Sequence, residues 1–415
     1  MQHSPSAYFY LTIAVVFLFI TWLGYRLLTR WHSGYRHRGI KYSYWLISVG
    51  SLLTMTVSRS LRPADGYMSF FLQAFIYAVY TWVIGLLVLL PVMFVLYIIR
   101  FMVRRVGNKQ QKAESVLPRE HQGITEISRR DFLRGVAAAA PLASLAISSG
   151  GVFVGDKYIS KQQHNLSFAN LPDQLTDYKI AQISDTHIGP FFGMDKLDRV
   201  LTMITQEKPD LLVITGDLID DLNLLTPTME RLNRFFPTIP QGIYYCWGNH
   251  EYFRNIDAIR KAWESSPVFV LENTNRKVLD GKLPFYLLGV DYPWADKKED
   301  QQTKRRGFIN RALSGVPDEA FRLLIAHHPD FFDNSFENKI PLTLAGHTHG
   351  GQVALFGKSL LPVQYKYMRG LYQQDGNYGY VSVGTGHWMP FRIGCPAEVT
   401  FFTLKRSFPG PSVGI

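Results

Sequence analysis

The chain has 415 residues and a formal net charge of +11, yet residues 1–160 carry 17 Lys and Arg against 6 Asp and Glu, whereas residues 161–415 carry 27 of each. A nucleic-acid-binding domain should show a basic stripe on its folded surface, so we expect no nucleic-acid partner. The two cysteines, Cys246 and Cys395, are too few for a disulfide framework or a thiolate metal cluster, although one bridge between them remains open.

Three uncharged apolar stretches predict transmembrane helices within residues 1–105. Tyr8–Tyr25 is long enough to span a bilayer, and Tyr42–Ser58 is at the lower limit of length. Tyr67–Ile99 is typical of one long tilted helix, with a bend near Gly85 or Pro91. Because none of these stretches contains an ionisable residue, they favour an anchor over a transporter or proton relay.

Basic residues beside these stretches predict the orientation of the chain. The loop 26–41 carries five basic residues and no acid, and the segment after residue 100 is also strongly basic. The positive-inside rule places both in the cytoplasm and the amino terminus outside. If Tyr42–Ser58 does not cross, the amino terminus moves inside while the later domain still lies outside.

Residues 106–160 read as a basic linker with a fourth apolar segment, an Ala-rich run at 135–155. The sequence 128–134, Ser-Arg-Arg-Asp-Phe-Leu-Arg, resembles a twin-arginine export signal, which would make the Tat export machinery a partner. The alternative is a basic flank before a fourth membrane helix. Both interpretations predict a multi-pass inner-membrane protein with its carboxyl-terminal domain on the periplasmic face.

Residues 165–407 predict a third region, in which polar motifs follow five apolar runs that are typical of buried strands. The runs are Lys179–Ile183, Leu211–Thr215, Gly242–Trp247, Phe321–Ala326 and Pro341–Ala345. The motifs that follow them contain Asp185 and His187, Asp217, Asn249 with His250 and Glu251, His327, and His347 with His349. Ligands gather at the carboxyl ends of strands in open α/β sheets, so we expect these side chains along one edge of one sheet.

Helices between the strands complete an α/β pattern. Leu197–Ile204, Thr226–Phe236 and Asn255–Trp263 predict helices. Further strands are expected at Phe285–Val290, Gly379–Val383 and Val399–Leu404. The pattern predicts sheets covered by helices.

The order D-x-H, G-D, G-N-H-[DE], H and G-H-x-H resembles the signature of the calcineurin-like metallophosphoesterases over about residues 175–405. Gly346–Gln352 and Pro390–Arg392 are similar to the membrane-attached or exported branch of that family, which includes YaeI- and YkuE-type phosphodiesterases and transmembrane proteins with a metallophosphoesterase domain. The resemblance implies an α/β fold, a four-layer α/β/β/α sandwich, preceded here by an α-helical transmembrane region.

The motif residues predict a site for two divalent metal ions. Asp185, His187, Asp217 and His349 would form one site, and Asp217, Asn249, His327 and His347 the other. Asp217 would bridge the ions, since a carboxylate has two oxygens. Oxygen and imidazole ligands without thiolate suit Mn, Fe or Zn. His327 is preferred over its neighbour His328 because it lies nearer the end of the strand.

Asn249 and His250 are the expected catalytic residues. The family resemblance implies that His250 protonates the leaving group, as a general acid does. Glu251 is a candidate to orient His250. Arg392 is a candidate to contact a phosphate, or else forms an ordinary ion pair. His387 is a candidate to line a substrate pocket with Trp388, or else the two lie in an exposed loop.

These observations predict a membrane-anchored, dinuclear-metal-dependent phosphoesterase, with phosphodiesterase activity as the first choice. A metal-bound hydroxide would cleave the P–O bond of a phosphoester from a lipid or the cell envelope. Specificity is expected from loops such as Asp291–Arg306. One alternative is a lipid-linked pyrophosphatase of the UDP-2,3-diacylglucosamine type, which needs a cytoplasmic site. Another is a non-catalytic metal-binding scaffold, although such proteins usually lack ligands.

Overall fold

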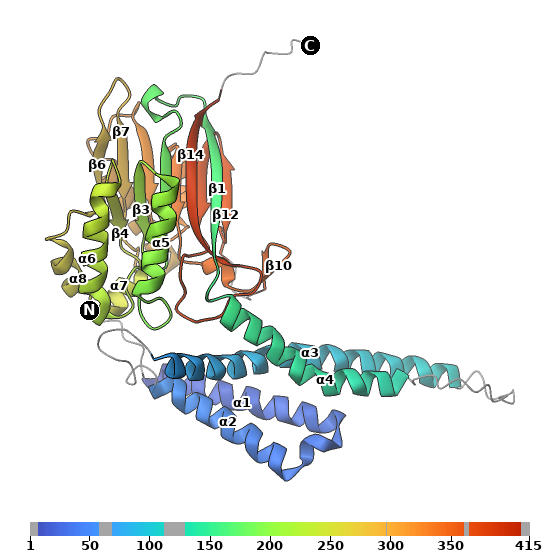
Figure 1. Cartoon of the computed structure of the whole chain (residues 1–415). Helices are drawn as coiled ribbons and strands as arrows, with labels where there is room; N and C mark the ends of the chain where they lie inside the picture. The colour runs from blue at the N-terminus through green and yellow to red at the C-terminus, as the bar shows by residue number, and fades with distance from the viewer. Residues whose placement is uncertain (1–6, 58–68, 112–128, 296, 361–364, 408–415) are drawn as a thin grey trace, which may run out of the picture. The chain divides into compact units, whose positions relative to one another are not determined.

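The chain divides into two units between Val154 and Gly155. The computed structural model describes residues 7–57, 69–111, 129–295, 297–360 and 365–407. Figure 1 shows a helical unit built from the earlier residues and a sheet-containing unit built from the later ones.

The helical unit contains one long helix where the sequence predicts one. Its helices are α1 (Ala7–Trp31), η1 (Ser33–Arg36), α2 (Arg38–Val57), α3 (Phe70–Gln111), α4 (Arg129–Ser149) and the π-turn η2 (Gly150–Val154). α3 has 42 residues and continues through Pro91 without a break. The prediction of a single helix in that region is therefore confirmed for the residues described.

Three helical segments are long and apolar enough to cross a membrane among the described residues. They are Leu11–Trp31, Phe70–Met102 and Phe132–Val154. The expected second span lies in α2, which forms a helix but is not one of the three. α2 carries several hydroxyl side chains, and one of them, Ser48, accepts a hydrogen bond from Trp82 Nε1 (3.0 Å) inside the bundle. The Ala-rich run supplies the third candidate span instead.

Hydrogen bonds between helices help to hold this unit together. Tyr44 donates to Thr21 O (2.8 Å), and Ser148 of α4 donates to Thr81 O of α3 (2.9 Å). In an apolar medium such bonds and small residues at the contacts favour helix association, and Ala137 and Ala140 of α4 are buried in the bundle. α4 is therefore part of the helical bundle, and it contains most of the fourth apolar segment expected at 135–155. Ser128 of the twin-arginine-like motif lies outside the described residues.

The second unit contains two six-stranded sheets. The first has the order β1 (Ile159–Phe168), β14 (Ala397–Arg406), β2 (Lys179–Ile183), β3 (Leu211–Thr215), β4 (Ile243–Cys246) and β5 (Phe269–Val270). The second has the order β12 (Gly370–Gln374), β13 (Asn377–Val381), β9 (Leu342–Ala345), β8 (Phe321–Ile325), β7 (Phe285–Gly289) and β6 (Thr274–Leu279). A short hairpin, β10 (Ala354–Leu355) with β11 (Lys358–Ser359), stands apart from both.

Helices cover the outer faces of the two sheets. The first sheet packs on α5 (Met194–Glu207), α6 (Leu225–Phe235) and α8 (Ile256–Trp263), and the second on α9 (Lys298–Leu313) and α10 (Phe331–Glu337). α7 (Asn249–Arg254) is a short helix after β4, and single turns lie at η3 (Asp173–Leu175), η4 (Leu222–Leu224), η5 (Phe236–Thr238) and η6 (His349–Gly351). Between the sheets lies an apolar core that includes Val213, Leu323 and Leu342. The four-layer α/β/β/α architecture is therefore confirmed.

Two details differ from the sequence-based expectations. The five strands that precede the polar motifs are divided between the sheets, β2, β3 and β4 in one and β8 and β9 in the other. Buried strands of both sheets have similar apolar sequences, so local pattern does not reveal the division. In addition, α9 begins at Lys298 inside the expected specificity loop Asp291–Arg306, with Glu299 and Asp300 in a first turn that favours acids.

Candidate metal centre

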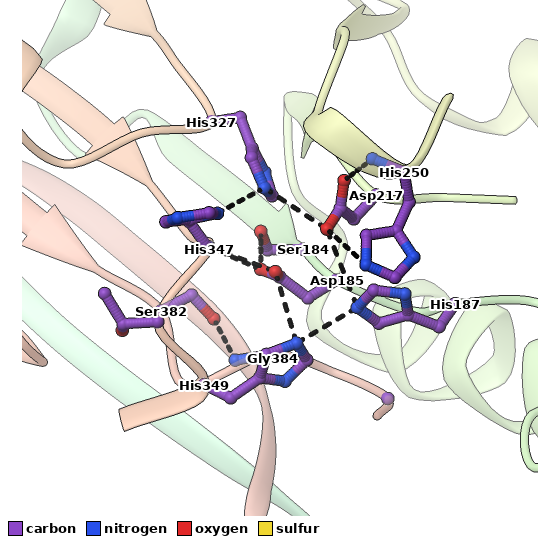
Figure 2. A network of polar contacts seen from close by, with 12 residues as sticks. Ser184, Asp185, His187, Asp217, His250, His327, His347, His349, Ser382 and Gly384 are labelled. Carbon is purple, nitrogen blue, oxygen red and sulfur yellow. Dashed lines mark hydrogen bonds and ion pairs between the residues drawn. The ribbon is translucent and has the colours of Figure 1, made fainter. Parts of the chain in front are cut away.

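The carboxyl ends of strands from both sheets meet at one edge of the second unit. The side chain of Gln182, in β2, ties them together because its Nε2 donates to Thr215 Oγ1 of β3 (2.9 Å) and to Ala345 O of β9 (3.0 Å). This amide is fully buried. The loops that follow β2, β3, β4, β8 and β9 are therefore brought to one place, and Figure 2 shows their side chains converging there.

One group of converging side chains consists of Asp185, His187 and His349. The Nε2 atoms of the two histidines lie 3.0 Å apart, and His349 Nε2 is 3.5 Å from Asp185 Oδ1. All three residues are buried. Their ligand atoms lie within 4.8 Å of one another, which is close enough for them to hold one metal ion.

A second group consists of Asn249, His327 and His347. Asn249 Oδ1 lies 3.0 Å from His327 Nε2 and 3.0 Å from His347 Nδ1, and the two ring nitrogens are 3.2 Å apart. The neighbouring His328 points elsewhere, since its Nδ1 accepts a hydrogen bond from the backbone of Asp330 (3.2 Å). The structure thus brings His327 rather than His328 into the site, as preferred from the sequence.

Asp217 lies between the two groups. Its Oδ2 is 3.7 Å from His187 Nε2 and 3.3 Å from His327 Nε2, while its Oδ1 accepts a hydrogen bond from the backbone N–H of His250 (2.8 Å). Asp217 therefore lies within reach of both groups, at the place expected of the bridging carboxylate. The bridge itself stays a prediction.

The backbone of these loops is unusual at the same residues. Asp185, His187, Asp217, His347 and His349 all have positive φ, between 48° and 76°. Non-glycine residues rarely adopt this conformation, and when it clusters it often marks a functional site. The close approach also requires glycine at 248, where an added Cβ would overlap the Asp217 carboxylate.

Hydrogen bonds behind the rings help to direct their nitrogen lone pairs. His327 Nδ1 donates to Thr215 O (2.8 Å), so the lone pair of its Nε2 points into the site. The backbone N–H of His347 donates to Asp185 Oδ1 (3.0 Å) and holds the two loops together. Such outer contacts usually orient metal-binding histidines and raise their basicity.

His250 lies beside Asp217 and is held by Asp220. Its Nδ1 is 2.6 Å from Asp220 Oδ1, its Nε2 is 4.0 Å from Asp217 Oδ2, and its ring meets that of His187 edge to face. Burial lowers the pKa of His250, but the negative charges of Asp217 and Asp220 outweigh burial and raise that pKa to about 9. The two carboxylates therefore favour the protonated form of His250, the form that a general acid needs.

Asp220 is a site residue that the sequence interpretation missed. It also lies 3.5 Å from His187 Nδ1, so one carboxylate touches a residue of the first group and the expected acid. Burial opposes its ionisation, yet the two histidines keep the pKa of Asp220 well below its usual range. Its position three residues after Asp217, in Gly-Asp-Leu-Ile-Asp, was the available signal.

Glu251 does not orient His250, contrary to expectation. Its fully buried carboxylate accepts hydrogen bonds from the backbone N–H groups of Asp217 (3.1 Å), Leu218 (2.7 Å) and Gly248 (2.8 Å), and from the Tyr245 hydroxyl (2.7 Å). Glu251 therefore fixes the loop that carries Asp217. Successive side chains of a helix point in different directions around its axis. In the short helix α7 this separates the carboxylate of Glu251 from the ring of its neighbour His250.

Arg392 is buried behind His349 and not aimed at an open phosphate position. Its guanidinium donates to the carbonyls of Val383 (2.8 Å), Gly386 (2.6 Å) and Cys395 (3.0 Å), and its Nη2 lies 3.2 Å from His349 Nδ1. Arg392 therefore holds one loop in shape around a site histidine. Neither proposed alternative, a phosphate contact or an ordinary ion pair, describes these contacts.

His387 is likewise buried and belongs to an ion-paired cluster. Its Nε2 lies 2.6 Å from Asp156 Oδ1, and the same carboxylate oxygen accepts a hydrogen bond from Lys196 Nζ (2.6 Å). Trp388, by contrast, is exposed. The two residues therefore do not share an exposed loop, and a role for His387 at a substrate pocket stays a prediction. Cys246 and Cys395 are buried free thiols with no bridge between them.

The donor set fits divalent cations. Two imidazole nitrogens face each other within each group, at 3.0 Å in the first and 3.2 Å in the second. Carboxylate and amide oxygens lie close to them. Converging lone pairs of this kind repel unless protons or cations lie between them, and N/O donors suit borderline and hard metals. Divalent cations at the two groups would complete the coordination.

Comparisons with known proteins agree with this geometry. Residues 178–351 match the family model described as calcineurin-like phosphoesterase, and residues 6–156 match one described as probable calcineurin-like phosphoesterase, transmembrane domain. The Bacillus subtilis (strain 168) metallophosphoesterase YkuE is 30% identical over 302 residues, covering 68% of this chain and 100% of that protein.

Other relatives are matched over part of their length. A transmembrane protein with metallophosphoesterase domain from Danio rerio is 30% identical over 250 residues, 57% of this chain and 55% of that protein. A solved dimetal phosphatase from Danio rerio covers 50% of this chain and 88% of its own at 12% identity and a TM-score of 0.31, too low to support an argument. On the full-length match to YkuE and the two family models, the chain belongs to the calcineurin-like phosphoesterase family, as a metallophosphoesterase with a transmembrane domain.

Proposed function

We propose that this protein is a membrane-anchored phosphodiesterase that uses two divalent metal ions. The observation that carries the proposal is the position of Asp217, whose Oδ2 lies within 3.7 Å of a histidine of each ligand group while His250 stands beside it. Asp185, His187 and His349 would hold one ion, and Asn249, His327 and His347 the other, with Asp217 shared.

The chain's own residues supply the remaining chemistry. When bound, paired cations clamp phosphoryl oxygens and lower the pKa of a water molecule that attacks phosphorus. His250 carries a proton at neutral pH and gives it to the leaving oxygen from Nε2, the ring nitrogen that does not contact Asp220. Asp220 fixes the ring, and Glu251 fixes the loop of Asp217.

The substrate class is a phosphodiester from a lipid or another envelope component. A transmembrane unit in the same chain supports a substrate found at the membrane. A pyrophosphatase acting on a UDP-2,3-diacylglucosamine-type lipid is the weaker choice, because it needs a cytoplasmic site. A non-catalytic scaffold is disfavoured by the complete donor set, with Mn, Fe or Zn as the candidate metals.

The orientation of the chain is a further part of the proposal. The basic flanks of the apolar segments support a multi-pass inner-membrane protein with the metal centre on the periplasmic face. The twin-arginine-like sequence around Arg129 and Arg130 supports export by the Tat machinery. Protease added to spheroplasts should remove the second unit, and complete protection would overturn this orientation.

The activity is tested with the full-length protein in detergent and Mn²⁺. We expect hydrolysis of bis(p-nitrophenyl) phosphate by the wild type and none above background by Asp217→Asn. The expected result includes inhibition by EDTA and recovery with Mn²⁺. A folded wild type that binds Mn²⁺ but turns over neither a phosphodiester nor a phosphomonoester would favour the scaffold.

A further inference from the structure

The most exposed apolar side chains of the second unit gather at the edge that carries the metal centre. Among its described residues, Phe356 is 96% exposed, followed by Leu360 (60%), Tyr158 (58%), Leu355 (55%) and Trp388 (52%). We call these five residues the apolar rim. Clusters of exposed large apolar residues are unusual on soluble surfaces and mark interaction sites.

The strand register places the apolar rim at this edge. Ile159 of β1 lies opposite Ala397 of β14, and Thr400 of β14 lies opposite Gln182 near the end of β2. The start of β1, with Tyr158 before it, is therefore at the end of the sheet from which Asp185 projects. Figure 1 shows β10 at the same end of this unit as the start of β1.

The β10–β11 hairpin is built onto the loops of the metal centre. It begins a few residues after His349, and the backbone N–H of Ala354 donates to Ile393 O (2.8 Å). Gln352 Nε2 donates to the carbonyls of Met389 (3.2 Å) and Phe391 (3.3 Å), in the segment that carries Trp388. The base of the hairpin and the segment that carries Trp388 are thus fixed to each other and to the site.

The turn of this hairpin carries an unexpected residue. Phe356-Gly357 forms a two-residue connection with φ of 47° and 78°. Asp375-Gly376 connects β12 and β13 in the same way, with φ of 51° and 77°. Two-residue hairpins with two positive φ values favour Asn or Asp before Gly, so Asp375 follows the preference and Phe356 does not. A bulky, exposed residue in a conformation it disfavours needs an explanation other than folding.

Exposed basic side chains outnumber acidic ones around the apolar rim. Lys157, Lys358 and Arg199 are exposed beside it, and Asp198, which lines the hollow next to Tyr158, is ion-paired with Arg231. The three segments that form it, residues 155–160, 352–360 and 386–396, contain one acid, Asp156, which is buried and paired with Lys196. Aromatic side chains with lysines are typical of surfaces that sit at the headgroup level of a bilayer with anionic lipids. A bilayer is also close along the chain, since only Gly155–Tyr158 separate a candidate membrane span from β1.

We propose that the apolar rim docks on an anionic lipid surface, with Phe356 inserted at the tip, and so presents the metal centre to phosphodiesters of membrane lipids. This rests on the proposed function for its substrate class, but not for the docking itself. The excess of exposed basic side chains around the rim and the exposed Phe356 at its tip favour a lipid surface over a soluble protein partner as the occupant.

The test of docking does not depend on enzymatic activity. Phe356→Cys and Asp375→Cys are matched positions, at two turns of the same type, and Asp375 lies at the end of its sheet far from Ala345 and the metal centre. Each variant of the full-length protein, in nanodiscs of phosphatidylethanolamine and phosphatidylglycerol, receives a fluorescent label, with the wild type as control for its two buried cysteines. We expect acyl-chain spin-labelled lipids to quench label 356 several-fold more than label 375. Equal quenching, or none at 356, overturns the proposal.

The substrate consequence is tested with Phe356→Asn, which suits a positive φ and should preserve the turn. Two probes share one leaving group: bis(p-nitrophenyl) phosphate in solution and a phosphatidyl p-nitrophenyl ester in the nanodisc. We expect the ratio of lipid to soluble hydrolysis to fall about tenfold or more, given the apolar area removed from the bilayer. An unchanged ratio overturns the link to lipid substrates. Failure of the wild type on both probes would refute the proposed function, and the quenching result would still decide the docking.

Discussion

Two clusters of buried charged and polar side chains lie in the second unit, and they are satisfied in different ways. Around Asp156, the carboxylate receives Lys196 Nζ and His387 Nε2, both at 2.6 Å, and Lys196 also donates to Phe191 O (2.6 Å). At the metal centre, ring nitrogens face one another at 3.0 and 3.2 Å with no basic side chain between them. The first cluster neutralises itself, whereas the second leaves facing ring nitrogens that need a proton or a cation between them.

The difference teaches how to separate a structural cluster from a functional one. Burial alone does not do so, because Asp156, Asp185 and Asp217 are all buried. A buried charge with a matched partner holds segments together, here the start of the second unit and the loop of His387. Converging donors without matched partners, on strained backbone, favour a ligand site.

The largest effect is expected from Asp217→Asn. The change preserves shape but removes the charge shared by the two ligand groups, so we expect kcat/KM to fall by at least about 10⁴-fold. Steady-state hydrolysis of bis(p-nitrophenyl) phosphate with Mn²⁺ measures it. Asp156→Asn is the matched control, since it also neutralises a buried Asp, and should retain most activity per folded molecule. Equal losses in both variants would erase the distinction between the clusters.

His250→Gln should reduce kcat by about 10² to 10⁴-fold through loss of general acid catalysis. The loss should depend on the leaving group, because p-nitrophenolate departs without much protonation whereas an alkoxide does not. Rates are therefore compared for a nitrophenyl and an alkyl phosphodiester in wild type and variant. A loss that is the same for both leaving groups would contradict the role of His250 as an acid.

Removal of one partner from the Asp156 cluster should destabilise the fold but leave the affinity for metal ions unchanged. Asp156→Asn leaves Lys196 buried without its anion, a change that typically costs about 3–5 kcal/mol. Thermal unfolding should show a lower Tm. Mn²⁺ at 100 times its Kd should still raise the free energy of unfolding by about 2.7 kcal/mol, and so raise the Tm. Asp217→Asn should show the reverse: Mn²⁺ should no longer raise its Tm.

Among the variants at the metal centre, Asp220→Asn should have the smallest effect, about 10 to 100-fold in activity, as for other residues that orient a site histidine. The wild type should lose activity as pH rises through the pKa of His250, about 9 in this structure, because the acid must be protonated. Removing the negative charge of Asp220 lowers that pKa, so the alkaline limb should move to lower pH. A limb that stays in place would show that another group controls it.

The amino-acid sequence by itself determined the local elements and the residue types of the site. Strands β2 and β3 have the predicted bounds, Lys179–Ile183 and Leu211–Thr215, because each is an apolar run of strand length closed by a polar motif. The long helix α3 follows in the same way from an uninterrupted apolar stretch. Asp185, Asp217 and His327 could be named because they stand where such strands end.

Only the tertiary structure decided which side chains meet. Asp156 and His387 are 231 residues apart in sequence, and nothing local predicts their contact. Glu251 turns to the backbone of the Asp217 loop while Asp220 takes the place beside His250, because the path of each loop sets the direction of its side chains. The exposed Phe356 is recognised only when its turn is compared with that of Asp375. Periodicity reports burial of a segment, whereas partners are fixed by the packing of segments distant in sequence.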